Sequence, residues 1–293
     1  EAIILEASAL GELNDAIRHC LRCGKCKPVC TTHVPRANLL YSPRNKILAT
    51  GLIIEAFLYE EQTRRGISLR HFAELNDVAD HCTVCHKCLS PCPVDIDFGD
   101  VTVRMRQILI DRGQKRFSPA TWLSMAYLNA TDPAMVRFLK KAVIDWGYAA
   151  QRLGYTFAKR LGLLALRRRP AATTGAPAIT TQVIEFVKKP LPANVPSGTL
   201  RQLLRLEDNK TVPILRDPAR ASDESEAVFY FPGCGSERLF SQVGLATLAM
   251  LYKVGAQTVL PPGYLCCGYP QTSAGEADKG LRITTDNRVL FHR

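Results

Sequence analysis

Two cysteine runs of one spacing, both in the N-terminal third, constrain this chain more than any other feature. Both read C-x-x-C-x-x-C-x-x-x-C; the first holds Cys20, Cys23, Cys26 and Cys30, and the second holds Cys82, Cys85, Cys88 and Cys92. Three thiolates spaced by three along one tight turn can each bind a different iron of a cubane, while the fourth ligand arrives from elsewhere. The spacing therefore predicts two [4Fe–4S] clusters and a role in electron transfer.

The fourth cysteine of each run is expected to serve the other cluster, as it does in two-cluster ferredoxins. The predicted ligands are Cys20, Cys23, Cys26 and Cys92 for the first cluster, and Cys82, Cys85, Cys88 and Cys30 for the second. Pro93 follows the second run, where the chain must turn away from a cluster, whereas Thr31 stands in that place after the first run. This departure predicts a slightly weaker first cluster.

Structural zinc and disulfides are the simpler alternatives. A zinc site uses four ligands around one ion, so a third cysteine three residues further on is surplus to it. Disulfides need an oxidising compartment, and neither a signal peptide nor an apolar run long enough to span a bilayer is visible. His19, His81 and His86 flank the runs; with a full set of cysteines present, we expect them around the ligands or in solvent rather than as ligands.

The N-terminal region outside the runs is predicted to be helical. Apolar residues recur at helical spacing over 10–18, 47–60, 69–78 and 101–111, and Gly113 ends the last of these segments. The motifs YSPRNKI from Tyr41 and CPVDID from Cys92 resemble the α-helical ferredoxin domain, over about residues 10–115. That domain occurs in iron–sulfur subunits of glycolate oxidase, anaerobic glycerol-3-phosphate dehydrogenase and heterodisulfide reductase, and in some FAD-linked D-2-hydroxyacid dehydrogenases.

A basic segment follows this region. The chain has a net charge of +11, which two oxidised clusters of about −2 each would reduce to roughly +7. Between Ala134 and Arg169 the cations are Arg137, Lys140, Lys141, Arg152, Lys159, Arg160, Arg167, Arg168 and Arg169, against the single acid Asp145. An apolar stripe shares the segment at helical spacing, made of Met135, Leu139, Ala142, Trp146, Ala149, Leu153, Phe157, Leu161 and Leu164.

Two interpretations of this stripe stay open: a helix at a membrane surface, or a helix that packs on its own protein with its cations in solvent. The glycines at 147, 154 and 162 weaken a free-standing helix and favour the second interpretation. Nucleic acid is a third option for the run Arg167-Arg168-Arg169, but no reading element accompanies it, and we expect no nucleic-acid partner.

The C-terminal part is predicted to contain a parallel α/β unit. Prolines from Pro170 to Pro218 indicate a linker with one short helix near 200–206. Strands are then expected at 227–231 and 256–260 around a helix at 237–253, and ligands gather beyond the carboxyl ends of such strands. Cys234 and the pair Cys266-Cys267 fall at those ends.

The spacing from Cys234 to Cys266-Cys267-Gly268, with Gly-Tyr-Pro at its end, resembles the first half of the cysteine-rich CCG domain of heterodisulfide reductase-like proteins. In that family a C-x-x-C follows, which this chain lacks. The three cysteines are therefore candidates for a third metal site, a redox-active thiol group, or inert remnants of a duplicated domain.

The expected fold is mainly α. It comprises an α-helical ferredoxin domain with two clusters at 1–115, a basic amphipathic segment at 116–169, a proline-rich linker at 170–223 and a smaller, incomplete α/β domain of CCG type at 224–293. The chain begins at Glu1 rather than Met, and we expect it to be part of a longer polypeptide.

The chain has no dinucleotide fingerprint, P-loop or HExxH motif, so FAD and the unknown catalytic residues are expected on another domain or subunit. The resemblance implies an oxidoreductase component. It would take electrons from a flavoprotein that oxidises a 2-hydroxyacid such as D-lactate, glycolate or D-2-hydroxyglutarate, and pass them to a quinone or other acceptor, in the cytoplasm or at the inner membrane face. The alternatives are a disulfide-reducing subunit like heterodisulfide reductase, and a zinc-stabilised binding protein without catalysis.

Overall fold

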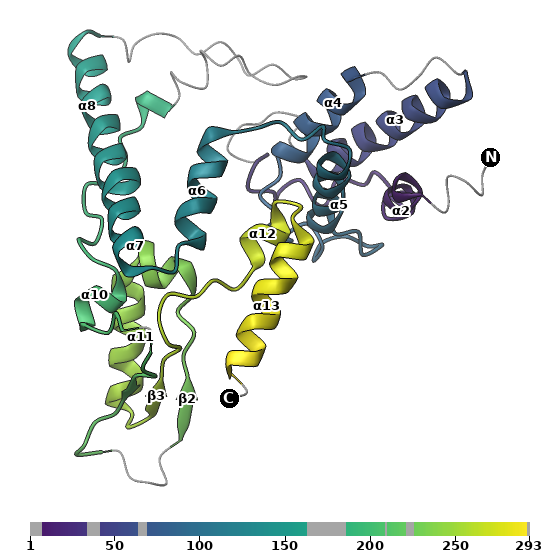
Figure 1. Cartoon of the computed structure of the whole chain (residues 1–293). Helices are drawn as coiled ribbons and strands as arrows, with labels where there is room; N and C mark the ends of the chain where they lie inside the picture. The colour runs from purple at the N-terminus through teal and green to yellow at the C-terminus, as the bar shows by residue number, and fades with distance from the viewer. Residues whose placement is uncertain are drawn as a thin grey trace. The chain divides into compact units, whose positions relative to one another are not determined.

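A computed structural model of the chain describes residues 8–33, 42–63, 69–162, 186–208, 210–220 and 226–291. Helices predominate and a small sheet lies in the C-terminal part, as predicted (Figure 1). The chain divides into two compact units. Among the described residues, unit 1 holds those before Ser118 together with Gln271–Lys279, and unit 2 holds the rest.

Unit 1 contains the four helices that the apolar spacing predicts. They are α2 (Ala9–Asp15), α3 (Pro43–Gln62), α4 (Leu69–Asp80) and α5 (Phe98–Asp111). Ser8 caps α2 by accepting the N–H of Gly11, and Asp97 caps α5 by accepting the N–H of Gly99. Each helix contributes apolar side chains to one core, among them the fully buried Leu13, Leu75, Met105 and Leu109. Cysteines of both runs pack on the edge of this core, which fixes where the candidate sites lie.

Unit 2 begins with a helical run that crosses the predicted amphipathic segment. It comprises α6 (Pro119–Asn129), α7 (Pro133–Leu139), the π-helical η2 (Lys140–Trp146) and α8 (Gly147–Arg160). Ser118 and Asp132 cap α6 and α7, and each helix starts with a proline, whose missing N–H costs nothing in a first turn. Leu164 and the run Arg167-Arg168-Arg169 lie outside the described residues.

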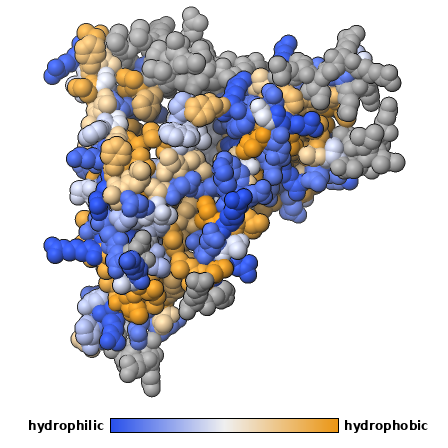
Figure 2. Space-filling model, in the orientation of Figure 1, coloured by the Kyte–Doolittle hydropathy of each residue, from blue (hydrophilic) through white to orange (hydrophobic). Residues whose placement is uncertain are grey.

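The apolar stripe of this segment is largely exposed over η2 and α8. Trp146 is 60% exposed, Leu153 72% and Phe157 62%, and apolar residues line this helix on the face seen in Figure 2. The buried positions are instead Lys140, Gln151 and Ala158. The helix thus packs on unit 2 through a polar and small-residue face, because the Gln151 amide donates to the carbonyls of Phe186 and Lys189.

The sheet of unit 2 has three short strands in the order β1-β3-β2. The strands are β1 (Ile214–Leu215), β2 (Ala227–Phe229) and β3 (Gln257–Val259), and the helical elements α10 (Leu200–Leu204), η4 (Gly235–Leu239) and α11 (Ser241–Lys253) belong to the same unit. The last helices, α12 (Tyr269–Ser273) and α13 (Ala277–Phe291), each have residues in both units. Strands β2 and β3 are parallel and joined through α11, which confirms the predicted strand–helix–strand unit. Strand β1, antiparallel to β3, lies inside the segment that we interpreted as a linker.

Candidate metal centres

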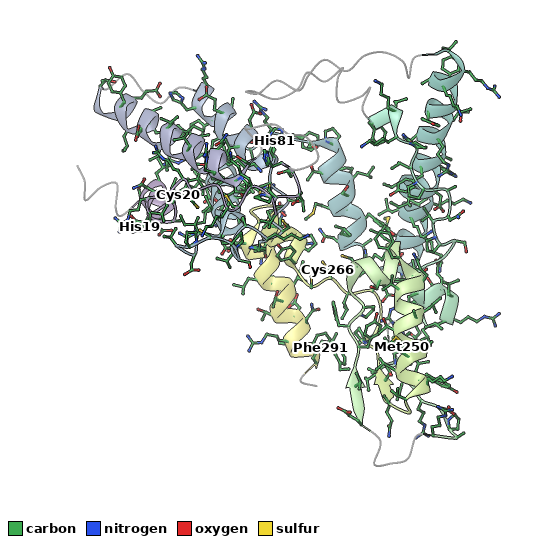
Figure 3. The ribbon with its side chains drawn as sticks, turned by 180° about the vertical axis from the view of Figure 1, so that it is seen from behind. His19, Cys20, His81, Met250, Cys266 and Phe291 are labelled. Carbon is green, nitrogen blue, oxygen red and sulfur yellow. The ribbon has the colours of Figure 1, made fainter. Side chains whose placement is uncertain are left out.

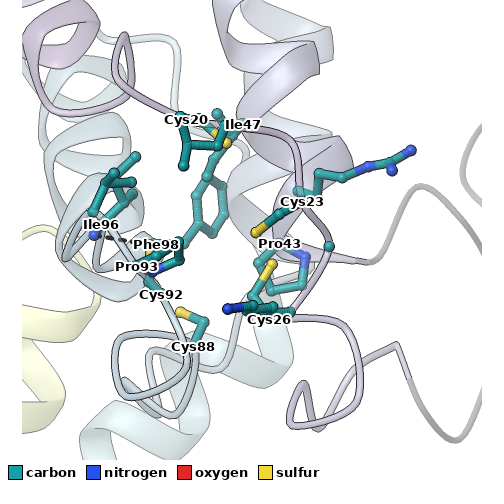
Figure 4. Close-up of a pocket in the computed structure, with 15 residues that line it drawn as sticks. Cys20, Cys23, Cys26, Pro43, Ile47, Cys88, Cys92, Pro93, Ile96 and Phe98 are labelled. Atoms are coloured by element: carbon teal, nitrogen blue, oxygen red, sulfur yellow. Dashed lines mark hydrogen bonds between the residues drawn. The ribbon is translucent and has the colours of Figure 1, made fainter.

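The first cavity of unit 1 is lined by thiols from both cysteine runs. Cys20, Cys23 and Cys26 enter it from the first run, and Cys92 enters from the second (Figure 4). The cavity encloses about 410 Å³ including its opening to solvent. Ile47 and Ile96 make part of its wall apolar, and the N–H of Ile96 donates to the Cys92 sulfur over 3.3 Å. Cys88 also lines this cavity, so its thiols are those expected for the first cluster together with one that was expected for the second.

The second cavity has the reciprocal set of thiols. Cys82, Cys85 and Cys88 line it together with Cys30, and it encloses about 310 Å³ including its opening. Pro43, Cys88 and Phe98 line both cavities, so the two share a wall. Cys30 thus lies with thiols of the second run and Cys92 with thiols of the first, while the crossed assignment of ligands to clusters stays a prediction.

The separation of the sulfurs fits a cluster better than a single ion. Around one tetrahedral zinc, with Zn–S bonds of about 2.3 Å, sulfurs lie about 3.8 Å apart. Within the described part of the chain, which includes every cysteine, no three thiol sulfurs lie within 4.8 Å of one another. Five thiols line the first cavity and four line the second, with Cys88 common to both, and thiols held further apart than one ion requires fit the soft-donor set of a [4Fe–4S] cluster.

The two cysteine loops repeat one backbone conformation. Arg22 and Val84, which precede the second cysteine of each run, have φ of 55° and 51°, and Gly24 and His86, which follow it, have φ of 78° and 56°. A β-branched residue such as Val84 rarely adopts a positive φ. The positive φ recurs at equivalent positions of both loops, which indicates that this turn conformation serves to orient the thiols. In the second loop, the N–H of Val84 donates to the Cys82 sulfur.

Thr31, which replaces the expected proline, connects the two runs. Its hydroxyl lies 3.1 Å from that of Thr83 and 3.8 Å from the Cys85 sulfur. Burial acts to raise the pKa of Cys85, but hydrogen bonds from the backbone N–H of Lys87 and from the two threonine hydroxyls outweigh it, and the pKa is lowered. Thr31, which stands where proline was expected, thus helps to stabilise the thiolate form of Cys85. The spacing of the cysteine runs did not predict this effect.

Burial favours the protonated form of two other thiols, those of Cys88 and Cys26. Burial raises the pKa of Cys88 to about 11, and the negative charges of Asp97 and Cys82 add to this. Burial likewise raises the pKa of Cys26, against a hydrogen bond from the backbone N–H of Arg44. A metal that binds these thiols must displace their protons, so loading of either cavity releases protons to solvent.

Of the three flanking histidines, only His86 lines a cavity. Its Nδ1 lies 2.6 Å from a carboxylate oxygen of Asp97, at the start of α5, and 3.8 Å from Asp100. His19 and His81 lie at different places in unit 1 (Figure 3). His19 accepts a hydrogen bond from Arg18, and Nδ1 of His81 lies 2.5 Å from the Asp77 carbonyl oxygen.

Two cations beside the second cavity were not among the predicted site residues. Lys46 of α3 is 1% exposed and lines the cavity, where its Nζ donates to the carbonyl of His81 and, over 3.2 Å, to the hydroxyl of Thr32. Arg106 of α5 donates to the Cys82 carbonyl over 2.8 Å and to that of Ser273 over 2.5 Å, both within unit 1. In the sequence, Lys46 stands in the motif YSPRNKI, and the motif alone does not indicate that it lies beside the thiols.

Cys266 and Cys267 act electrostatically on Cys234. Burial raises the pKa of Cys234, and the neighbouring charges of Cys266 and Cys267 raise it further, while that of Arg238 opposes them. The Arg238 guanidinium is buried, and it donates to the carbonyls of Tyr127 and Ala130.

The loop that carries the cysteine pair is held by α13. Asn287 donates to the Cys266 carbonyl over 2.7 Å, and Thr284 donates to that of Cys267 over 3.3 Å. A side chain at Gly268, whose φ is 84°, would lie 2.6 Å from the Gly280 carbonyl oxygen, which explains the glycine after the pair.

Comparison with known proteins finds a match in each of the two cysteine-containing parts of the chain. Residues 16–96 match the 4Fe-4S dicluster domain, and residues 228–292 match the cysteine-rich domain (CCG). The chain is 22% identical over 275 residues to the "Probable glycolate oxidase iron-sulfur subunit" of Bacillus subtilis (strain 168), an alignment that covers 93% of this chain and 53% of the relative. This chain thus spans about half the length of that relative.

No solved structure matches the chain. Among the described residues, no helix combines the length and the apolar character needed to cross a membrane. The two matched regions coincide with the two places where cysteines gather, in unit 1 around the paired cavities and in unit 2 around Cys234. The chain therefore combines a 4Fe–4S dicluster domain with a C-terminal cysteine-rich domain.

Proposed function

We propose that this chain is the iron–sulfur electron-transfer component of a flavin-linked oxidoreductase. The observation that carries the proposal is the pair of thiol-lined cavities with a common wall of Pro43, Cys88 and Phe98. A [4Fe–4S] cluster accepts and releases single electrons. Cys20, Cys23, Cys26 and Cys92 would hold the first cluster, and Cys82, Cys85, Cys88 and Cys30 the second.

The electron donor in this proposal is a flavoprotein domain or subunit that oxidises a 2-hydroxyacid. Glycolate is favoured because the printed name of the relative contains it, and D-lactate and D-2-hydroxyglutarate belong to the same chemical class. FAD would be bound by that partner, since this chain has no nucleotide-binding motif. Electrons would leave to a quinone or another acceptor, in the cytoplasm or at the inner face of its membrane.

Metal analysis of protein purified without oxygen tests the proposal. We expect about eight irons with a matching amount of sulfide per chain. Zinc without sulfide would instead favour the zinc-stabilised binding protein. A reduced protein that transfers electrons to a disulfide but not to a quinone would favour the heterodisulfide reductase-like alternative, in which the cysteine-rich domain is the catalytic end.

Cys234, Cys266 and Cys267 would form the exit for electrons, as a third metal site or a redox thiol group. The electrostatic effect of Cys266 and Cys267 on Cys234 and the fixed loop of the cysteine pair support this role. In the complex with its flavoprotein, Cys267→Ser should leave reduction of the two clusters intact and stop delivery to the acceptor. Thr284→Val, which removes a hydrogen bond from the same loop but no thiol, is the control. Unchanged turnover in Cys267→Ser and Cys266→Ser would make this group structural.

Contact with a membrane surface is a further part of the proposal. The exposed apolar residues of η2 and α8 are flanked by the cations Lys141, Lys159 and Arg160, an arrangement typical of helices that lie in the interface of an anionic bilayer. Lys140, which we counted among the cations of this segment, is not available for such contact, because it is buried and donates to Asp145 and Pro196. Co-sedimentation with anionic vesicles tests the contact.

A further inference from the structure

Lys46 is a buried cation without a carboxylate partner. Its ammonium group makes two hydrogen bonds to neutral oxygens, of His81 and Thr32, and lies 5.9 Å from the centre of the Phe98 ring. Within the described ranges no acidic side chain forms an ion pair with it. The other buried lysine, Lys140, does have an acidic partner, Asp145 at 3.4 Å. Burial of a charge is costly unless an opposite charge compensates it.

The second thiol set supplies the opposite charge. Lys46 lines that cavity and not the first. Burial lowers the pKa of its ammonium group, and the charges of Cys82, Cys30, Cys88 and Cys85 oppose this effect. The Thr32 hydroxyl, 3.2 Å from Nζ, also lies 3.2 Å from the Cys30 sulfur, so one hydroxyl connects the ammonium group to a ligand of the second cluster. The cations that line the first cavity, Lys25 and Arg44, are not buried.

We infer that the Lys46 ammonium group makes the second cluster the first of the two to be reduced. Each reduction adds one negative charge, and a buried cation beside the second thiol set stabilises that charge more than the partly solvated cations of the first cavity do. The inference rests on the proposed function, since it requires a cluster in each cavity. Lys46 acts here as a residue that tunes the site through charge, without binding the metal.

Redox titration with paramagnetic resonance on the full chain tests this inference. The signal of the second cluster is first identified with Cys85→Ser. In Lys46→Gln, which keeps a hydrogen-bond donor but removes the charge, the equilibrium constant for electron transfer from the first to the second cluster should fall at least tenfold. For a one-electron couple this corresponds to a drop of 59 mV in the midpoint potential of the second cluster.

The matched control is Lys87→Gln. Lys87 adjoins Cys88 in sequence, carries the same charge and is exposed, so water and salt should screen the loss of its charge and leave both potentials nearly unchanged. An equal shift in Lys87→Gln, or no shift in a fully loaded Lys46→Gln, would overturn the inference.

Iron and sulfide analysis distinguishes the remaining outcomes. Loss of four irons in both Lys46→Gln and Lys46→Met would show that the lysine serves assembly of the site, and would also overturn its role in tuning. A parent protein without iron and sulfide would refute the proposed function itself. If the parent protein contains both clusters and Lys46→Gln leaves their midpoint potentials unchanged, only the proposed role of Lys46 would be refuted.

Discussion

At the scale of single residues, the candidate sites depend on which thiol reaches which cavity. Cys30 is the last cysteine of the first run, yet it lines the cavity of the second run, and Cys92 does the reverse. Each site is thus incomplete until two segments separated by α3 and α4 have come together. A substitution in one run should therefore be felt in the cluster of the other.

Cys30→Ser should disturb the cluster held by Cys82, Cys85 and Cys88 and leave the other signal intact, because its sulfur belongs to that set. Paramagnetic resonance of the reduced variant measures this effect. Cys92→Ser is the reciprocal control and should disturb the set of Cys20, Cys23 and Cys26. If each variant altered the cluster of its own run, the crossed assignment would be wrong.

The sequence predicted which thiols line the two cavities better than it predicted the residues around them. Regular spacing is sufficient to expect eight thiols around two clusters, because the geometry of a cubane restricts it. Lys46 could have been recognised from its place on α3, where it shares a buried stripe with Thr50, Ile53 and Phe57 at intervals of four, three and four residues. A lysine on a buried stripe indicates a nearby anion. The Thr31 contact could not be predicted, since it depends on how the two loops meet.

At the scale of elements, the start of α5 links helix capping to the second cavity. Asp97 accepts the Gly99 N–H over 2.7 Å with one oxygen and contacts His86 with the other. A Cβ at Gly99 would lie 2.7 Å from the His86 ring, so the glycine allows the imidazole to lie against this turn. The cap therefore fixes a side chain that lines the metal site.

Asp97→Ala should lower the free energy of unfolding by more than about 1 kcal/mol, the usual cost of a lost N-cap. It should also alter the signal of the second cluster, because His86 loses its partner. Urea unfolding and paramagnetic resonance measure the two effects. Asp132→Ala is the control, since Asp132 caps α7 of unit 2 through a single bond to the Met135 N–H and lines neither thiol cavity. Equal destabilisation of both variants with an unchanged signal would refute the coupling.

The helical run of η2 and α8 should bind vesicles of anionic lipid in a salt-sensitive manner. Leu153→Ser with Phe157→Ser should reduce co-sedimentation at least tenfold, because these side chains supply the apolar contact. Screening within about 8 Å at physiological ionic strength should weaken the attraction of Lys159 and Arg160. Val243→Ser with Met250→Ser, two exposed apolar residues of α11, is the matched control. Equal binding of both double variants would leave the exposed stripe without a role at membranes.

The periodicity of the sequence identified the apolar stripe of η2 and α8, but not whether it faces the protein or the solvent. Apolar spacing alone does not distinguish a buried face from an exposed one, and here hydrogen bonds from Gln151 fix the orientation of the helix. Strand β1 was missed for a different reason. It has two residues between Pro213 and Pro218, and only pairing with β3 makes it a strand.

At the scale of the whole molecule, the two units should respond differently to loss of iron. Cysteines pack against the core of unit 1, so removal of clusters should lower its melting temperature by more than the 4–8 °C that about 1 kcal/mol typically represents in a domain of this size. The melting temperature of unit 2 should not change. Differential scanning calorimetry before and after chelation measures both. A parallel shift of unit 2 would indicate that Cys234, Cys266 and Cys267 hold iron as well.

The wall that the two cavities share has a consequence for how the molecule stores charge. Pro43, Cys88 and Phe98 line both sites, so the same protein side chains form the wall between them. An electron held in one cavity therefore repels a second electron from the other with little screening. Two clusters in these cavities would then fill stepwise, and under mildly reducing conditions the pair would hold one electron rather than two. The proposed flavin donor, which delivers electrons in pairs, would have to pass them on one at a time.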